Sequence, residues 1–510
     1  MTRPSTAETG VSVLIHCNAG LQYGMGHLMR ALTLSAEALE RGWAVAFAGD
    51  FDDEAQRILS ERIDRDRVFA IERDDQREAL PRLTESLAPR VVHIDSYLPE
   101  ADVLLGGPYL LSSVQDGAFG ARTADLTIDP TLDAESDAEA SRRGATHLSG
   151  IGFAMIRPQV RAERGRWSPS SARSRVLVVL GGTDPHHYTP RVLESLSASR
   201  RRLDITVVAP ASVNDEVQEI AARSSSQATV TGFLHDLPAA AVAHDLVISA
   251  AGTSVWDLAC MGVPTAMVCV TENQERGYDA AAARGLAVGV QRDPSGSWAG
   301  VEDEIVSLLD DESRLRELSS IGMATVDGLG AWRVAAAWES LLEIPMRGAV
   351  MAGEDLEVRR ATMADATLLF EWRNDPDTRR MSRSTGIVAW EDHLVWFSSV
   401  LSDPTRELFV VESEGQPVGT VRWDRRSGID WEASISLAPS SRGKGMSHRV
   451  LAAGERGIRS AEARRLIAGI NQENLPSRRL FARAGYLPHA PADAQGFAEY
   501  AKLLPPVGGE

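Results

Sequence analysis

The chain has 510 residues, of which 44% are hydrophobic and 24% charged, and its formal net charge is −18. This length is typical of two to four domains, and the composition is that of a soluble globular protein. The negative charge argues against nucleic acid and anionic membranes as partners. Apolar runs are shorter than a membrane span, and the first ten residues lack the apolar core of a signal peptide, so we expect a cytoplasmic protein without membrane insertion. Cys17, Cys260 and Cys269 show no metal-ligand spacing, and we expect no bound metal.

A glycine-rich turn that carries a histidine follows the first predicted strand. Residues 11–15 form an apolar run, residues 23–30 read YGMGHLMR, and residues 28–39 have helical periodicity. Gly26 allows a ligand to approach the backbone, and the free N–H groups of a helix N-terminus attract anions. The helix dipole disfavours an imidazolium, so His27 should be neutral and able to accept a proton. The alternative is a capped helix whose histidine only packs.

Strand-like and helix-like segments alternate along the first two thirds of the chain. Apolar runs that predict buried strands lie at residues 44–48, 91–94, 175–180, 205–209, 246–249 and 265–270. This alternation predicts two doubly wound, Rossmann-like α/β domains, at residues 11–165 and 174–345. Ligands of such sheets bind beyond the carboxyl ends of the strands, here in the cleft between the two domains.

The rest of the chain has a different pattern. Residues 344–354 contain Pro and Gly and predict a linker. Residues 356–505 begin with a strand and continue with helices rich in Trp and Arg. Further strands are predicted at residues 408–413, 418–423, 432–437 and 466–470, with a loop and a helix before the last of them. We predict an α+β domain here.

Small and polar residues follow the predicted strands of the second domain. Gly252, Thr253 and Ser254 open a helix, where backbone N–H and hydroxyl groups can bind phosphate. Asp257 lies one turn further on the same face and can accept two hydrogen bonds from ribose hydroxyls. Its alternative is an exposed acidic residue that is favourable near a helix N-terminus.

Two weaker motifs accompany this helix. The loop at residues 181–185, GGTDP, contains Gly182 and Thr183 and allows close backbone approach, although a plain turn would look the same. Asn273 and Gln274 follow the next strand and open another helix, where amide side chains can contact both a sugar and a phosphate. The alternative is an ordinary helix cap.

The order of these motifs resembles the nucleotide-sugar hydrolase of pseudaminic acid biosynthesis. The resemblance covers most of residues 11–345 and rests on GMGHLMR at 24–30, DSY at 95–97, GGTDP at 181–185, GTSVWD at 252–257, NQ at 273–274 and DGLGA at 327–331. That family is similar in fold to two-domain glycosyltransferases of the MurG type (GT-B). It hydrolyses UDP-2,4-diacetamido-2,4,6-trideoxy-β-L-altropyranose to UDP and the free sugar.

The resemblance implies a role for each matching residue. His27 would orient or deprotonate the water that attacks the anomeric carbon, without a metal, because the helix N-terminus at residues 252–254 can stabilise the charge of the leaving UDP. Tyr97 would line the sugar site. Asn273 and Gln274 would contact the sugar or the phosphates.

Five residues in four motifs depart from the family pattern. Residues 16–18 read HCN where the family has Arg-x-Asp, and Gln115-Asp116 stands where a paired Asp is common. Asp129 and Asp257 stand in place of Asn and Glu. We keep Asn18 among the predicted substrate-binding residues. The loss of charge at Asn18 and Gln115 leaves open which sugar is bound and whether water or another molecule is the acceptor.

A basic, glycine-rich loop follows a strand of the third domain. Arg442, Gly443, Lys444, Gly445 and Met446 form an R-G-x-G motif whose successive N–H groups can face a pyrophosphate, and a basic surface loop is the alternative. Together with the strand, helix and motif residues that follow, this loop resembles the GNAT acetyltransferases across residues 356–505. The resemblance implies acetyl-CoA as co-substrate, with its pyrophosphate on the loop and its pantetheine arm at two further residues, Asn474 and Ser477.

The third domain also contains candidate catalytic and nucleotide-binding residues. Glu432 is a candidate base for the substrate amine, and a solvent-facing strand residue is the alternative. Many GNAT enzymes have a tyrosine acid where this chain has Phe481, so Tyr486 or water would replace it, or activity would be weak. Arg373 and His393, with neighbouring tryptophans such as Trp396, resemble the subgroup that acetylates nucleotide-activated amino sugars, although tryptophans at helical spacing also form cores.

The two resemblances together predict a bifunctional enzyme of pseudaminic acid biosynthesis. Its partners would be a UDP-linked amino sugar, which is first N-acetylated at a 4-amino group and then hydrolysed, and acetyl-CoA. One alternative is a MurG-like glycosyltransferase in which His27 activates an acceptor hydroxyl. The third domain could instead be a sensor or docking module, or could act on another amine. The sequence does not indicate the oligomeric state.

Overall fold

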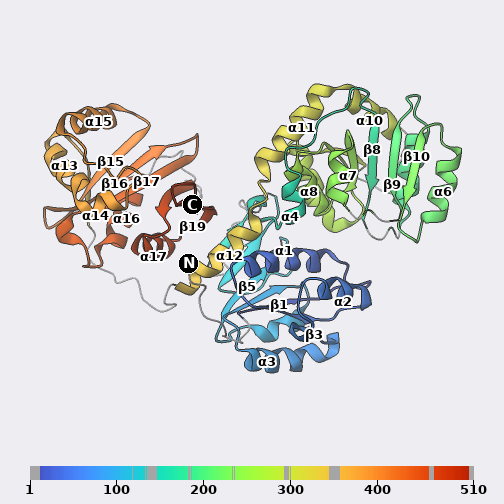
Figure 1. Cartoon of the computed structure of the whole chain (residues 1–510), viewed down its shortest axis with the longest axis horizontal. Helices are drawn as coiled ribbons and strands as arrows, with labels where there is room; N and C mark the ends of the chain where they lie inside the picture. The colour runs from blue at the N-terminus through green and yellow to red at the C-terminus, as the bar shows by residue number, and fades with distance from the viewer. Residues whose placement is uncertain are drawn as a thin grey trace, which may run out of the picture. The chain divides into compact units, whose positions relative to one another are not determined.

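The computed structural model describes residues 12–117, 119–132, 134, 146–181, 184, 186–232, 234, 236–291, 298, 300–343, 356–458 and 465–504. The chain divides into two compact units, Met1–Val334 and Ala335–Glu510 (Figure 1). The predicted linker at residues 344–354 lies outside the described residues. None of the described helices is long and apolar enough to cross a membrane.

The first unit begins with a seven-stranded parallel sheet in the order β3-β2-β1-β4-β5-β6-β7. Its strands are β1 (Val13–Cys17), β2 (Val45–Gly49), β3 (Val68–Ala70), β4 (Val91–Asp95), β5 (Leu110–Val114), β6 (Leu126–Asp129) and β7 (Thr146–Ser149). The helices of this part are α1 (Gly26–Glu40), α2 (Asp53–Ser60) and α3 (Gln76–Leu87). The helix that comes next in the chain, α4 (Pro158–Ala162), contributes Val160 to the core of the second sheet. Figure 1 shows α1 and α3 on opposite faces of the sheet, so the central strands are buried on both sides, which is why they read as continuous apolar runs.

The first unit contains a second parallel sheet, of six strands, in the order β10-β9-β8-β11-β12-β13. Its strands are β8 (Arg175–Val179), β9 (Asp204–Val208), β10 (Gln227–Thr231), β11 (Leu246–Ala250), β12 (Thr265–Val268) and β13 (Val288–Gln291). The helices are α5 (Tyr188–Ser197), α6 (Asn214–Arg223), α7 (Leu237–Val242), α8 (Ser254–Met261), α9 (Glu275–Ala283), α10 (Val301–Asp310) and α11 (Glu312–Thr325). The next helix, α12 (Gly330–Glu343), contains the division between the two units. The strand order confirms the predicted doubly wound fold for both sheets.

In each parallel sheet the chain reverses its direction of winding at the central pair of strands. The pair is β1 and β4 in the first sheet and β8 and β11 in the second. Ligands of doubly wound sheets bind beyond the carboxyl ends of the strands at such a switch point. α1 follows β1, and α8 follows β11, so the two motifs that the sequence singles out begin at these switch points.

The second unit has a mixed sheet of seven strands in the order β14-β15-β16-β17-β18-β20-β19. Its strands are β14 (Glu357–Arg360), β15 (Arg406–Ser413), β16 (Gln416–Arg425), β17 (Asp430–Leu437), β18 (Arg465–Asn471), β19 (Leu487–Ala490) and β20 (Phe497–Leu503). The helices are α13 (Ala366–Asn374), α14 (Pro376–Arg380), α15 (Trp390–Ser402), α16 (Met446–Gly457) and α17 (Leu475–Arg483). This arrangement confirms the predicted α+β class.

The single parallel pair of the mixed sheet opens towards its carboxyl end. β17 and β18 pair from Asp430↔Arg465 to Ala433↔Ala468. Beyond these residues both strands continue, to Leu437 and Asn471, without pairing with each other. The separation leaves backbone and side chains of both strands open to a cavity at the point where the glycine-rich loop follows β17.

Candidate active sites

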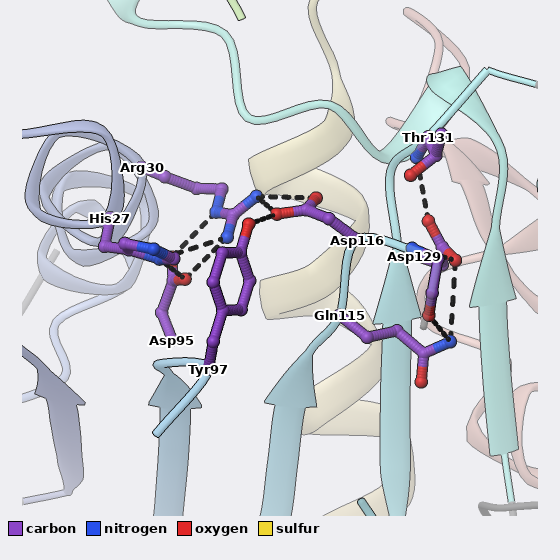
Figure 2. A network of polar contacts seen from close by, with 9 residues as sticks. His27, Arg30, Asp95, Tyr97, Gln115, Asp116, Asp129 and Thr131 are labelled. Carbon is purple, nitrogen blue, oxygen red and sulfur yellow. Dashed lines mark hydrogen bonds and ion pairs between the residues drawn. The ribbon is translucent and has the colours of Figure 1, made fainter. Parts of the chain in front are cut away.

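A histidine–aspartate pair lies at the switch point of the first sheet. Cys17, the last residue of β1, is in register with Asp95, the last residue of β4, and α1 begins shortly after β1. His27, the second residue of α1, therefore lies beside Asp95, and its Nδ1 is 2.7 Å from Asp95 Oδ1 (Figure 2). A neutral imidazole that donates its Nδ1–H to a carboxylate has Nε2 as its acceptor. The pair is arranged to present a base.

Arg30 connects this pair to a second carboxylate. Its Nε and Nη2 donate to the two oxygens of Asp95, at 2.8 and 2.6 Å, and its Nη1 donates to both oxygens of Asp116, at 3.0 and 3.1 Å. The hydroxyl of Tyr97 also donates to Asp116, and the Tyr97 ring meets the His27 ring edge-on with centroids 4.5 Å apart (Figure 2). The five side chains form one continuous polar network.

The electrostatics of the network fix the charge of its members. Asp95 is fully buried, which by itself would raise its pKa, but the charge of Arg30 and the hydrogen bonds from Arg30 and His27 outweigh burial and hold the pKa well below its usual range. Burial and the neighbouring Asp116 raise the pKa of Tyr97 far above neutrality, so its hydroxyl stays protonated and remains a donor.

A cavity of about 1440 Å³ lies next to this network, within the first unit. The first sheet contributes Gly26, Arg30, Tyr97 and Asp116, and the second contributes Gly181, Gly252, Thr253, Ser254, Asp257 and Gln274. His27 is not a lining residue itself. Its side chain is 17% exposed, and it lies between two lining residues of α1 and against the lining ring of Tyr97.

On the opposite side of the cavity, α8 begins at Ser254. The preceding Thr253 and Ser254 itself are exposed, whereas the N–H groups of Val255 and Trp256 already donate to the carbonyls of Gly252 and Thr253 at 3.1 Å each. A ligand at this helix N-terminus would therefore be bound by Thr253 and Ser254. Gln274 accepts a hydrogen bond from the N–H of Val270 at 3.1 Å, and its Nε2 lies only 3.4 Å from where a Cβ on Gly252 would stand. The structure thus brings together Gly252 and Gln274, which are far apart in sequence.

Asp257 already has a protein partner. Arg157 Nη2 donates to its Oδ2 at 2.8 Å. Burial nevertheless raises the pKa of Asp257, because desolvation outweighs the attraction of Arg157. The predicted hydrogen bonds to ribose would therefore have to be shared with Arg157. Three further predicted positions, Gly182, Thr183 and the side chain of Asn273, lie outside the described residues.

Asn18 has a structural position. It is 3% exposed and does not line the cavity, and its Oδ1 accepts hydrogen bonds from the N–H of Asp50 at 2.8 Å and from Gln76 Nε2 at 2.7 Å. These bonds tie the end of β1 to the end of β2. Asp129 acts similarly, because its carboxylate accepts from the N–H groups of Gly117 and Thr131 and so shapes the loops after β5 and β6 (Figure 2).

Asp95 and Arg30 belong to two of the sequence motifs, but the motifs gave neither residue a role. Two features of the sequence indicate that they belong to the site. Arg30 lies three residues after His27, on the same face of α1. Asp95 ends a buried apolar strand, and a carboxylate at such a position needs a buried cation or several donors.

A second cavity, of about 1360 Å³, lies in the second unit where β17 and β18 separate. Gly443, Gly445, Asn474 and Ser477 line it. The two glycines have φ angles of 71° and 72°, a left-handed conformation that side chains disfavour. Asn474 Oδ1 accepts from the N–H of Ser477 at 3.1 Å and caps α17. The N-termini of α16 and α17 both adjoin this cavity.

Of the other residues of the glycine-rich loop, Arg442 lines the cavity and Lys444 and Met446 do not. The guanidinium of Arg442 donates to Asp375 Oδ1 at 2.6 Å and to Thr378 Oγ1 at 2.7 Å, so it holds the N-terminus of α14. Lys444 is exposed and does not line the cavity, and Met446 packs against the hydrophobic core. The loop therefore borders the cavity with its two glycines and with Arg442, whose guanidinium is also bound to Asp375 and Thr378.

Glu432 lines the second cavity and belongs to a network of ion pairs across the sheet. Its Oε2 accepts from Arg426 Nε at 2.8 Å, and the same guanidinium is ion-paired with Glu499 on β20. Glu432 Oε1 accepts no hydrogen bond from the described residues. The position is compatible with the predicted contact to a substrate amine, and the assignment stays a prediction.

The residues predicted to contact a nucleotide, Arg373, His393 and Trp396, all line the second cavity but differ in how exposed they are. His393 is 1% exposed, its Nε2 donates to the Ala366 carbonyl at 3.0 Å, and burial lowers its pKa, so it is a packed and neutral side chain at the cavity wall. Arg373 lines the cavity and donates to the Ser384 carbonyl at 2.8 Å. Trp396 is 36% exposed, and the guanidinium of Arg422 lies 5.4 Å from its ring centre.

Tyr486 cannot take the place of the missing acid at Phe481. Its side chain is fully buried in the core, it does not line the cavity, and burial raises its pKa. Phe481 lines the cavity, and its ring contacts the Tyr486 ring edge-on, with the two ring centroids 4.9 Å apart. Of the two substitutes that the sequence leaves open, the structure removes Tyr486, because a buried phenol cannot reach a thiolate in the cavity.

Among the described residues, no group of three or more His, Cys, Asp or Glu side chains is placed to hold a metal ion.

Comparison with known proteins identifies the second unit. Residues 355–487 match the family model of the acetyltransferase (GNAT) domain. An uncharacterized protein of Methanocaldococcus jannaschii is 20% identical over 406 residues, which cover 76% of this chain and 78% of that protein.

Solved structures resemble each unit separately. MurG of Acinetobacter baumannii covers 64% of this chain and 99% of its own, with a TM-score of 0.49 and 17% identity. Spermidine N-acetyltransferase of Vibrio cholerae, in complex with CoA and spermine, covers 30% of this chain and 96% of its own, with a TM-score of 0.27 and 15% identity. Ribosomal-protein-alanine N-acetyltransferase of Brucella melitensis covers 29% and 100%, with a TM-score of 0.27 and 25% identity. By its match to the family model, the chain carries a GNAT acetyltransferase domain, which follows two parallel-sheet, Rossmann-like domains.

Proposed function

We propose that the chain is a bifunctional nucleotide-sugar enzyme. The first unit hydrolyses UDP-2,4-diacetamido-2,4,6-trideoxy-β-L-altropyranose to UDP and the free sugar. The second unit transfers the acetyl group of acetyl-CoA to the 4-amino group of the UDP-sugar precursor. The two reactions are consecutive, because the product of the acetylation is the substrate of the hydrolysis.

The observation that carries the hydrolytic half is the His27–Asp95 pair beside a cavity that also contains the open N-terminus of α8. A diphosphate bound at α8 and a sugar bound at the first sheet would place the anomeric carbon between them. His27 Nε2 accepts a proton from water as the oxygen attacks that carbon, and the bond between the carbon and the UDP oxygen breaks. The helix N-terminus stabilises the charge that develops on UDP.

The match to the GNAT domain supports the acetyl-transfer half, together with the cavity at the separated strands. Backbone N–H groups of the loop at Gly443 and Gly445 and the N-terminus of α16 suit a pyrophosphate. The amine of the acceptor attacks the thioester carbonyl and gives up a proton, for which Glu432 is the candidate base. The carbon–sulfur bond breaks, and CoA leaves as a thiolate that takes a proton. With Phe481 at the wall and Tyr486 buried, we assign this protonation to water, and weak activity is the alternative.

Mass spectrometry of the full-length protein with the UDP-linked 4-amino sugar and acetyl-CoA tests both halves. We expect free 2,4-diacetamido sugar, UDP and CoA. Release of CoA with an intact acetylated UDP-sugar would mean that the first site uses another sugar or another acceptor, as a MurG-like glycosyltransferase would. Absence of all three products would contradict the proposed substrate.

A further inference from the structure

We propose that Asp95 is the positioning residue of the first site, which holds His27 in the Nδ1–H form and keeps Nε2 free as the base. The inference rests on the proposed hydrolysis for its catalytic meaning. Its structural part, the tautomer of His27, stands on the contacts alone. Neither the sequence motif nor the comparisons assign a role to Asp95.

The geometry leaves Asp95 one way to contact His27. The carboxylate is fully buried at the end of β4, where pairing with Cys17 of β1 fixes the backbone. Its oxygens accept three hydrogen bonds, two from Arg30 and one from His27 Nδ1. An ionised carboxylate can only accept, so the hydrogen between Nδ1 and Oδ1 belongs to His27, and the second ring nitrogen carries none while the ring is neutral.

The charge count also favours proton uptake by His27. Arg30 carries one positive charge, and Asp95 and Asp116 carry two negative charges, so the cluster has a net charge of about −1 while His27 is neutral. When His27 takes a proton from water, the cluster becomes neutral. A partly buried site favours this change, because the new imidazolium lies 2.7 Å from an ionised carboxylate.

The other titratable groups around Asp95 do not change this count near neutral pH. Burial lowers the pKa values of His16 and His93 to about 4, so both are uncharged. Burial raises the pKa of the Cys17 thiol, which is also uncharged. Tyr97 stays protonated. None of these four groups therefore adds a charge to the cluster near neutral pH.

The direct test is the ¹⁵N spectrum of the His27 imidazole in the full-length protein, assigned by its disappearance in His27→Gln. We expect the Nδ1–H form in the wild-type protein. In Asp95→Asn, the side-chain NH₂ replaces one carboxylate oxygen, so either His27 Nδ1–H or an N–H of Arg30 loses its acceptor. Asp95→Ala removes both acceptor oxygens. In both variants we expect the Nε2–H form to gain population. An unchanged Nδ1–H form in both would overturn the inference, whatever the protein hydrolyses.

The kinetic test follows UDP release. We expect Asp95→Asn to lower kcat about 10²- to 10⁴-fold, the range of general-base effects, with the affinity for UDP unchanged. The acidic limb of the pH profile should move to lower pH, because the imidazolium loses its counter-charge.

Asp102→Asn is the matched control, since Asp102 pairs with Arg122 outside the network. Wild-type protein that releases no UDP contradicts the proposed function. A wild-type rate and profile in Asp95→Asn contradicts the role of Asp95.

Discussion

Two buried histidines should make the first unit sensitive to acid. His16 and His93 are fully buried in the first sheet, and desolvation lowers the pKa of each to about 4. The unfolded chain binds these protons near pH 6.5, whereas the folded protein binds them only near pH 4. Stability is therefore unaffected by these groups above about pH 6.5 and falls as pH decreases from there to about 4, by at most about 3 kcal/mol for each histidine.

Urea unfolding at pH 7 and pH 4.5 tests this prediction in His16→Asn. Asparagine can still donate to the Ala48 carbonyl, which His16 Nδ1 contacts at 3.0 Å, but it does not titrate. We expect the variant to lose less stability than the wild-type protein between the two pH values. His186→Asn, at an exposed position of the same unit, should keep the wild-type difference. An equal loss in all three proteins would contradict the assignment.

Gly445 should be required by its backbone conformation. It precedes α16 with a φ of 72°, and no atom lies within 4 Å of the place where its Cβ would stand. A β-branched residue in this conformation costs roughly 1–2 kcal/mol, and its side chain would project where a pyrophosphate is proposed. We expect Gly445→Val to weaken CoA binding at least tenfold by calorimetry. Gly428→Val, in the hairpin between β16 and β17, is the control, and unchanged CoA affinity in Gly445→Val would rule out the loop as the pyrophosphate site.

The chemistry of single residues was only partly predictable from sequence. The turn at Gly26 and His27 could be recognised because glycines and a histidine between a strand and a helix are rare and local. The roles of Asp95 and Arg30 depend on a contact across 65 residues of sequence. Asn18 has the same chemistry whether it binds a sugar or a neighbouring strand, and only its buried hydrogen bonds to Asp50 and Gln76 show its use here.

At the scale of elements, the central strands were predictable and several edge strands were not. The runs at 175–180 and 246–249 correspond to β8 and β11, which are apolar because helices cover both faces. β10 is a partly exposed edge strand and lacks a continuous apolar run, and β13, at the other edge, has only four residues, one of them Gly289. β6 is fully buried but contains Asp129, whose donors come from loops that no local pattern reveals.

The contact between the glycine-rich loop and α14 gives a prediction for Arg442. The motif predicts that this arginine binds CoA, but its guanidinium is engaged by Asp375 and Thr378, which are at the start of α14. We expect Arg442→Ala to increase amide hydrogen exchange in α14, because the helix has only five residues and loses a fixed partner. We expect CoA affinity to fall less than about threefold, a small effect on the scale of a charge-assisted hydrogen bond.

Hydrogen exchange and calorimetry on the same samples separate the two roles of Arg442. Arg442→Lys is the conservative comparison, since lysine retains the charge without the two-pronged geometry. If Arg442→Ala abolishes CoA binding and leaves α14 exchange unchanged, then the guanidinium leaves Asp375 when CoA binds, and the contact seen in the structure belongs only to the free protein.

At the scale of the whole molecule, each cavity is built from one unit alone. The lining residues of the first lie between Met25 and Gly277, and those of the second lie between Leu369 and Phe497. The chain divides between Val334 and Ala335, so neither set crosses the division. Each proposed reaction therefore has its residues within a unit of its own, and the two activities should be separable by single substitutions in the full-length chain.

His27→Ala and Gly445→Val make this separation measurable. We expect His27→Ala to abolish release of UDP, because the base is lost, while UDP binding and the rate of CoA release stay at wild-type levels. We expect Gly445→Val to lose CoA release and to hydrolyse a pre-acetylated UDP-sugar at the wild-type rate. Both products can be followed in one reaction by mass spectrometry. If either substitution lowers both rates in parallel, with the thermal transition of the other unit unchanged, the two sites depend on each other and the assignment of one reaction to each unit fails.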